Sequence, residues 1–366
     1  MDDERKLAKK GRGALSNRAG RFETQQSERE FDGWEQGGAD EADYEADAGS
    51  PGETRLTRDA TRSIIVSNRS PDLPFDASIN PYRGCEHGCV YCYARPSHAY
   101  LGHSPGLDFE RELHYKPEAG ALLRAELARP GYVPKTIALG TNTDPYQPIE
   151  RKLRIMRDIL EVLCAHRHPV AITTKGSLIE RDIDLLSDMA ADDCAVAAVS
   201  FTTLDGELAR KLEPRASAPH RRLQTIERLA AAGIPVHVSV APVIPAVNDA
   251  EIEKLLKAAV DAGAGSAGWI MVRLPGEVEQ LFEEWLAEHL PDRAAKVMNK
   301  IRDAHGGRGN DPRFHHRFHA EGPYAEAVRA RFDIACRRLG LGARVRRLSS
   351  AKFVPPSKDP EQLSLL

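Results

Sequence analysis

Six short apolar runs alternate along the chain with segments of helical period, and this alternation limits the fold more than any other feature. The runs cover residues 78–82, 135–140, 169–174, 194–201, 234–240 and 268–272. Between them, apolar residues recur every three to four positions, as in residues 151–166, which is typical of amphipathic helices. Strands separated by helices pair in parallel through right-handed crossovers. The sequence therefore predicts an α/β fold, a partial six-stranded TIM-type β/α barrel.

The flanking segments differ in composition from this central part, which we expect to span residues 61–290. Residues 1–60 are rich in Gly, Asp, Glu and Ser and have no hydrophobic period, so we expect a disordered tail. Residues 291–348 have a helical pattern without strands, which predicts a helical C-terminal extension packed on the barrel. Residues 349–366 contain Pro and Lys and are expected to form a flexible tail.

The charge is distributed unevenly. Residues 23–53 contain eleven acidic residues and one basic residue, and because the net charge is −3, the rest of the chain carries +7. A basic body is compatible with a nucleic-acid partner, and residues 313–319 combine Arg, His and Phe in a way that suits phosphate contact and base stacking. No apolar run reaches 18 residues and the first residues have no apolar signal segment, so we expect a cytoplasmic protein with no membrane partner.

Three of the six cysteines, Cys85, Cys89 and Cys92, lie within eight residues at the spacing CxxxCxxC, directly after the first apolar run. Three thiolates this close can hold one side of an iron–sulfur cluster. In a four-iron cluster one iron then remains open to a substrate or cofactor. A structural zinc site would need four ligands, and a zinc knuckle that uses His87 as the fourth is the alternative. The remaining cysteines lie in apolar segments and are interpreted as core residues.

The cysteine motif, with the aromatic Tyr91 just before its third cysteine, resembles the signature of the radical S-adenosylmethionine (SAM) superfamily. The flanking sequences Ile-Asn-Pro-Tyr-Arg-Gly before Cys85 and Tyr-Ala-Arg after Cys92 resemble the narrower DNA repair photolyase group, which is related to spore photoproduct lyase. Within that group the chain is similar to an uncharacterised bacterial subfamily, over about residues 63–348.

This resemblance implies the partial barrel and a 4Fe–4S cluster held by the three cysteines. It implies that SAM binds the open iron and is cleaved reductively to a 5′-deoxyadenosyl radical, which abstracts hydrogen from a substrate. An electron donor such as flavodoxin or ferredoxin is implied as well.

Polar residues at the ends of the next predicted strands are the candidates for binding SAM. The resemblance places an amino-binding motif after the second strand, where this chain has Thr141, Asn142, Thr143 and Asp144. Two further candidates are Lys175, which suits the SAM carboxylate, and Ser200, which suits the ribose or methionine; Tyr91 completes the set. Residues 213–215 and Arg222 are expected to close the site. Helix caps and turns would explain several of these residues equally well.

The substrate is predicted less sharply than the cofactor. The resemblance indicates a nucleic-acid lesion or base, with lyase-like or DNA-repair chemistry, while an RNA base or a peptide side chain remains open. Spore photoproduct lyase is expected to carry a cysteine after the second strand, but residues 140–143 here are Gly-Thr-Asn-Thr. This difference argues against the spore photoproduct as the substrate.

The last five residues, from Gln362 to Leu366, resemble the peptide that docks on the bacterial sliding clamp. They predict the clamp as a partner. The alternative function is a non-catalytic iron–sulfur or zinc protein that binds DNA or the clamp.

Overall fold

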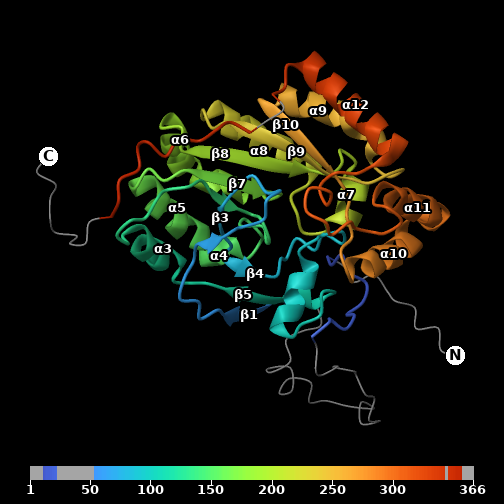
Figure 1. Cartoon of the computed structure of the whole chain (residues 1–366), viewed down its shortest axis with the longest axis horizontal. Helices are drawn as coiled ribbons and strands as arrows, with labels where there is room; N and C mark the ends of the chain where they lie inside the picture. The colour runs from blue at the N-terminus through green and yellow to red at the C-terminus, as the bar shows by residue number, and fades with distance from the viewer. Residues whose placement is uncertain (1–10, 23–52, 343–344, 357–366) are drawn as a thin grey trace, which may run out of the picture.

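The computed structural model describes residues 11–22, 53–342 and 345–356. Its main element is a seven-stranded sheet with the strand order β10-β9-β8-β7-β6-β3-β2 (Figure 1). The strands are β2 (Val66–Ser67), β3 (Ala77–Ile79), β6 (Ile137–Leu139), β7 (Val170–Thr174), β8 (Ala195–Phe201), β9 (Val236–Val243) and β10 (Ser266–Met271). The six strands from β3 to β10 pair in parallel, and β2 adds an antiparallel edge. The predicted partial six-stranded barrel is confirmed, with one extra edge strand.

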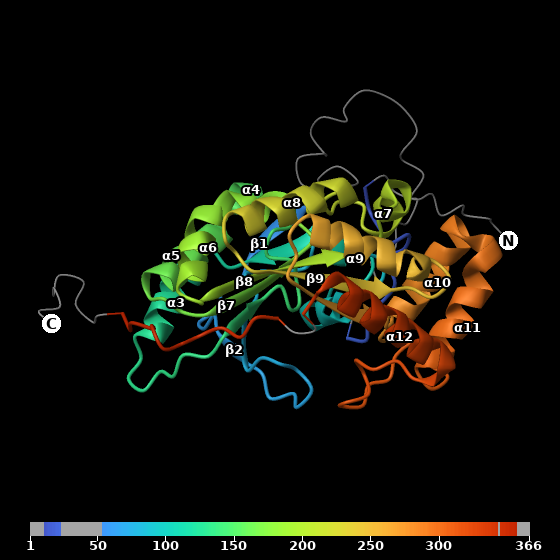
Figure 2. The same cartoon turned by 90° about the horizontal axis from the view of Figure 1, so that it is seen from above.

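Helices connect the parallel strands, and Figure 2 shows α5, α6, α8 and α9 in a row along one face of the sheet. The helices of this region are η1 (Arg95–Leu101), α2 (Asp108–Arg111), α3 (Ala119–Leu127), α4 (Glu150–Leu153), α5 (Ile155–Ala165), η2 (Ser177–Asp182), α6 (Ile183–Ala191), α7 (Gly206–Leu212), α8 (Pro219–Ala231), η3 (Asp249–Glu251), α9 (Ile252–Asp261) and α10 (Val278–His289). The single helix predicted over residues 151–166 is wrong at its start. Arg154 has a left-handed φ of 57°, which separates α4 from α5.

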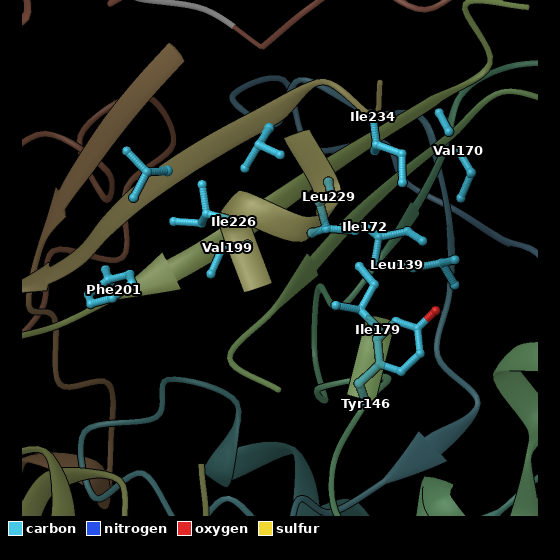
Figure 3. Packing of buried hydrophobic residues seen from close by; sticks show 14 of the residues in the cluster. Leu139, Tyr146, Val170, Ile172, Ile179, Val199, Phe201, Ile226, Leu229 and Ile234 are labelled. Atoms are coloured by element: carbon cyan, nitrogen blue, oxygen red, sulfur yellow. The ribbon is translucent and has the colours of Figure 1, made fainter. Parts of the chain in front are cut away.

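The core lies between the sheet and these helices. Figure 3 shows Val199 of β8 and Ile172 of β7 close to Ile226 and Leu229 of α8. Every residue of β8 is buried, as expected for a central parallel strand covered on both faces. The continuous apolar run over residues 194–201 therefore corresponds to a strand with no solvent-facing side.

A second, three-stranded sheet has the order β1-β5-β4 and comprises β1 (Arg55–Arg58), β5 (Glu112–Tyr115) and β4 (Tyr82–Arg83). It corrects the predicted first strand over residues 78–82, because β3 ends at Ile79 and Tyr82 pairs with Tyr115. Pro81 lies at the break and has no backbone N–H to donate to a ladder. The chain therefore leaves the main sheet just before the cysteines.

Residues 11–22, here called the N-terminal arm, pack against the body of the protein, which corrects the expected disorder of residues 1–60. The backbone N–H groups of Gly13 and Ala14 donate to the buried carboxylate of Glu110 at 3.0 and 2.9 Å. The Ser16 hydroxyl donates to Glu284 of α10 at 2.6 Å, beside which the arm runs in Figure 1. Composition alone missed the arm because its partners lie about a hundred or more residues away. Residues 1–10 and 23–52 of the predicted tail lie outside the described residues.

Changing Gly13 to alanine should loosen this arm. A Cβ at Gly13 would overlap the carbonyl oxygen of Gly88, whereas a Cβ at Gly206 would meet no atom within 4 Å. We expect Gly13→Ala to cost about 1–3 kcal/mol of stability and to speed tryptic cleavage after Arg18. Thermal unfolding and mass mapping of the cleavage sites measure both effects. Gly206→Ala is the matched control, and equal behaviour of the two variants would contradict the packing described here.

The C-terminal part contains η4 (Pro291–Arg293), α11 (Ala294–Ala304) and α12 (Gly322–Leu339), in agreement with the predicted helical extension. Residues 345–356 correct the expected flexible tail, because they pack at the end of the sheet away from α7 and α10 (Figure 1). There the N–H of Val354 donates to the carbonyl of His166 at 3.0 Å, and the N–H of Ser349 donates to that of Asp193. Residues 362–366, the predicted clamp peptide, lie outside the described residues. Among the residues that the structure describes, we find no helix that combines the length and the apolar character of a membrane span.

Candidate functional site

Residues 84–92, here called the cysteine loop, lie beyond the carboxyl end of β3. Its three cysteines are free; Cys85 and Cys89 are buried and Cys92 is partly buried. Burial, followed by nearby charges, raises the pKa of the Cys85 and Cys89 thiols, and burial also raises that of Cys92. Backbone hydrogen bonding acts in the opposite direction on two of the thiols: that of Asp144 lowers the pKa of Cys85, and that of Ala94 and Arg95 lowers the pKa of Cys92.

This donor set fits an iron–sulfur cluster. Cysteine sulfurs are the usual ligands of such clusters, and hydrogen bonds to those sulfurs tune them. Thiols that burial holds protonated give up their protons when a metal binds. In the described residues, no group of three or more His, Cys, Asp or Glu side chains is arranged to hold a single metal ion. His87, the proposed fourth zinc ligand, faces Asp144 with 3.3 Å between Nδ1 and Oδ2, so the geometry favours a cluster over the zinc knuckle.

Arg95 fixes the shape of the cysteine loop through buried hydrogen bonds, and the sequence did not predict this role. Its side chain is fully buried. Its Nε donates to the carbonyl of Cys89 at 2.9 Å, and its Nη2 pairs with Glu110 at 2.5 Å and donates to the carbonyl of Gly88 at 3.2 Å. Because Glu110 also accepts from the N-terminal arm, the arm, the arginine and the cysteine loop form one hydrogen-bonded unit. Arg95 was visible in the sequence only as part of the Tyr-Ala-Arg flank.

The segment after β6 also forms hydrogen bonds with the cysteine loop. Gln147 is fully buried; its Oε1 accepts from the N–H of Glu86 at 2.8 Å and its Nε2 donates to the carbonyl of Gly84 at 3.3 Å. Among the predicted SAM residues here, Thr141 and Asn142 contact Asn80, at 3.4 Å through the Thr141 hydroxyl and at 3.1 Å through the Asn142 N–H. Both are partly exposed.

Thr143 and Asp144, which the sequence also predicted to bind SAM, use their side chains within the protein. The Thr143 hydroxyl is buried and donates to the carbonyl of Tyr82 at 3.0 Å. Both carboxylate oxygens of Asp144 accept protein hydrogen bonds, including those from the Thr174 hydroxyl and the N–H of Lys175, each at 2.7 Å. Burial opposes the charge, but His87 and these donors hold the pKa of Asp144 below its usual value. The two side chains therefore join loops, and their polar atoms are used within the protein.

Lys175 and Ser200 do come together, at the carboxyl ends of β7 and β8. Lys175 Nζ donates to the Ser200 hydroxyl at 2.5 Å and lies 3.6 Å from the carboxylate of Glu213 and 6.0 Å from the ring centroid of Tyr91. The Tyr91 hydroxyl donates to the same carboxylate. The structure thus links Lys175 and Ser200, which the sequence placed at the ends of two strands, with Tyr91 of the cysteine loop.

Glu213 is the centre of this network. It is fully buried and also accepts from Thr202 and Arg222. Burial alone would raise its pKa, but Arg222 and Lys175, with these hydrogen bonds, hold the pKa of Glu213 at about 2. This carboxylate holds the Lys175 side chain in place beside the cysteine loop. The Glu-Pro-Arg sequence was the only signal for Glu213, and it indicated a place near the site without showing this role.

Comparisons with known proteins agree with this geometry. The sequence profile of the Radical SAM superfamily matches residues 79–259, from β3 to α9. Uncharacterised proteins of Mycobacterium tuberculosis and Mycobacterium bovis are 40% identical over 232 residues, which cover 63% of this chain and 68% of theirs. An uncharacterised protein of Methanocaldococcus jannaschii is 26% identical over 173 residues, 47% of this chain and 62% of that one.

Solved structures of spore photoproduct lyase share the fold. One variant, with bound AdoMet and dinucleoside spore photoproduct, has a TM-score of 0.57 at 15% identity, covering 80% of this chain and 82% of that one. Another variant has a TM-score of 0.58 at 14% identity with the same coverage. Together with the matched profile and the cysteine motif, these findings establish that the chain belongs to the radical SAM superfamily, whose members use a 4Fe–4S cluster and SAM.

Proposed function

We propose that Cys85, Cys89 and Cys92 hold the 4Fe–4S cluster and that the protein uses it to act on a substrate by radical chemistry. The observation that carries this proposal is the set of three free cysteines in one loop, of which Cys85 and Cys89 are buried and Cys92 is partly buried. When bound, the cluster supplies the electron that cleaves SAM and leaves a 5′-deoxyadenosyl radical to abstract hydrogen. The non-catalytic iron–sulfur or zinc protein is the alternative.

Within this proposal, the residues around the loop bind and orient SAM. Lys175 offers an ammonium to the SAM carboxylate, and the ionised Glu213 keeps that ammonium in position. Thr141, Asn142 and Ser200 supply neutral polar groups at neighbouring strand ends. Tyr91 forms part of the wall, with its hydroxyl held by Glu213 and Thr202. Thr143 and Asp144 support the site by joining its loops.

The substrate that we propose is a nucleic acid, with a DNA lesion or a modified base as the reacting group. The basic charge of the chain outside residues 23–53 supports this class, and the fold is shared with a lyase solved with a dinucleoside lesion. A flavodoxin or ferredoxin as electron donor, the sliding clamp as a partner and a cytoplasmic location complete the proposal. The spore photoproduct itself is not the proposed substrate, because residues 140–149 contain no cysteine.

Anaerobic reconstitution tests this function. The protein is loaded with iron and sulfide, reduced, and incubated with SAM, and the products are separated by chromatography. We expect iron near four per chain and formation of both 5′-deoxyadenosine and methionine that depends on the reductant. A zinc-loaded sample is the control and should form neither product. Protein that carries its full iron complement yet forms no 5′-deoxyadenosine would favour the non-catalytic alternative.

A further inference from the structure

Arg273 lies just beyond the carboxyl end of β10, at the end of the sheet where the cysteine loop is found. Its guanidinium carbon is 4.6 Å from the ring centroid of Tyr93 and 4.7 Å from that of Phe318. Tyr93 directly follows Cys92, and its hydroxyl donates to the carbonyl of Thr141. Arg273 therefore stands next to the candidate SAM site, although the sequence interpretation did not select it.

These contacts extend into a row of alternating rings and guanidinium groups, here called the arginine–aromatic ladder: Tyr93, Arg273, Phe318, Arg317 and Phe314. The guanidinium carbon of Arg317 is 5.0 Å from the ring centroid of Phe318 and 5.1 Å from that of Phe314. Both ends of the ladder are open to solvent, since Tyr93 is 45% exposed and Phe314 is 54% exposed. Its members come from three separate segments of the chain, so it exists only in the folded protein.

The two arginines of the ladder differ in their partners. Arg317 forms a two-point ion pair with Asp72, with nitrogen–oxygen distances of 2.6 and 2.8 Å. No hydrogen bond or ion pair joins the Arg273 side chain to any residue that the structure describes. The rings of Tyr93 and Phe318 lie on it, and the like charge of Arg317 is nearby. Arg273 is partly buried, and this burial lowers the pKa of Arg273.

A guanidinium that has no anionic partner among the described residues can donate charge-assisted hydrogen bonds to an anion. Exposed aromatic faces in turn favour flat, unsaturated rings. A nucleotide is a ligand that carries both an anion and a flat ring. In a duplex the base faces are covered by their neighbours, so a base can stack on the ladder only after it has left the helix.

We propose that the arginine–aromatic ladder binds an unpaired nucleotide of a single-stranded or locally opened nucleic acid, with its phosphate on Arg273 and its base on an exposed ladder ring. This proposal rests on the proposed function for its chemistry and adds the conformation of the substrate and the residues that receive it. Because Tyr93 adjoins Cys92, a nucleotide on the ladder is positioned beside the cysteine loop.

Fluorescence anisotropy on the reconstituted holoprotein tests the ladder with four labelled probes. They are a single-stranded oligonucleotide, the duplex of the same sequence, an abasic single strand that keeps only the sugar–phosphate backbone, and a polyglutamate peptide. We expect the single strand to bind at least about tenfold more tightly than the duplex or the peptide. The abasic strand should fall between the single strand and the peptide.

Two ladder variants measure the contributions of the phosphate and the base to binding separately. Arg273→Ala should weaken both the normal and the abasic strand by about tenfold. Phe314→Ala should weaken binding of the normal strand and leave binding of the abasic strand unchanged. Phe314 is exposed, so its removal leaves the core intact. Arg129→Ala removes an equal charge from an exposed site before β6, at the opposite end of the sheet, and should match the wild type.

Equal affinity for duplex and single strand, or equal losses in Arg273→Ala and Arg129→Ala, would overturn the proposal, as would tighter binding of polyglutamate than of the single strand. Failure of the ladder proposal and failure of the proposed function give different experimental results. Wild-type protein that forms 5′-deoxyadenosine without preferring single strands would refute the ladder alone. A clear single-strand preference without 5′-deoxyadenosine would support the ladder and refute the radical chemistry.

Discussion

Replacing Cys92 with alanine is expected to abolish both cluster binding and 5′-deoxyadenosine formation. In this variant the cubane cluster would keep only two protein thiolates as ligands. The rest of the site cannot supply the third, because the three remaining described cysteines lie outside the cysteine loop. Iron content, visible absorbance and product formation after anaerobic reconstitution measure the effect. We expect iron to fall well below the wild-type level and product to fall to the background without reductant.

Cys164→Ala is the matched control. Cys164 is a half-buried thiol in the last turn of α5, near the amino end of β7 and therefore at the opposite end of the sheet. Its replacement should leave iron content and product formation unchanged. A Cys92→Ala protein that retained iron and activity, or a Cys164→Ala protein that lost them, would contradict the assignment of the three cysteines.

Arg95→Met should cause the largest loss of stability. The substitution keeps much of the side-chain volume but leaves Glu110 as a buried carboxylate without its arginine, and it removes the donors that hold the carbonyl groups of the cysteine loop. Breaking a buried ion pair from one side costs about 3–5 kcal/mol. Urea unfolding followed by circular dichroism measures this loss, and faster release of iron from the reconstituted protein should accompany it.

Arg346→Met makes the same substitution in an exposed ion pair with Asp193, in which both side chains are about half accessible. Exposed pairs contribute less than about 1 kcal/mol, so this variant should unfold close to the wild type. Similar unfolding midpoints for the two variants would show that the Arg95–Glu110 pair does not hold the cysteine loop together.

The sequence predicted the main sheet well because its signal is local. The parallel strands appear in the sequence as apolar runs, and β8, in which every residue is buried, is the clearest case. The small sheet was missed because β1 and β4 are four and two residues long and pair only through β5. The N-terminal arm was missed for a related reason. Its few apolar residues have no period, and its order depends on Glu110, which no local pattern connects to it.

For the candidate site, the sequence identified which strand ends carry polar groups but could not show where those groups point. Lys175 and Ser200 meet, whereas Thr143 and Asp144 turn inward to join loops. Arg273 follows the last predicted strand and could have been selected by the same rule. Arg273 is important because it has no anionic partner among the described residues. Only the folded structure shows this.

The cysteine loop draws its support from both directions along the chain. Upstream of the loop, the N–H of Gly13 donates to Glu110, which belongs to the same hydrogen-bonded unit as the loop. More than a hundred residues downstream, the carbonyl of Leu212 and the N–H of Arg215 form hydrogen bonds with the loop itself. During synthesis, the three cysteines therefore leave the ribosome long before the segments that enclose them. Iron delivered at that stage would meet an unsupported loop, so we expect cluster assembly to be a late step in biogenesis that follows folding of the chain beyond α7.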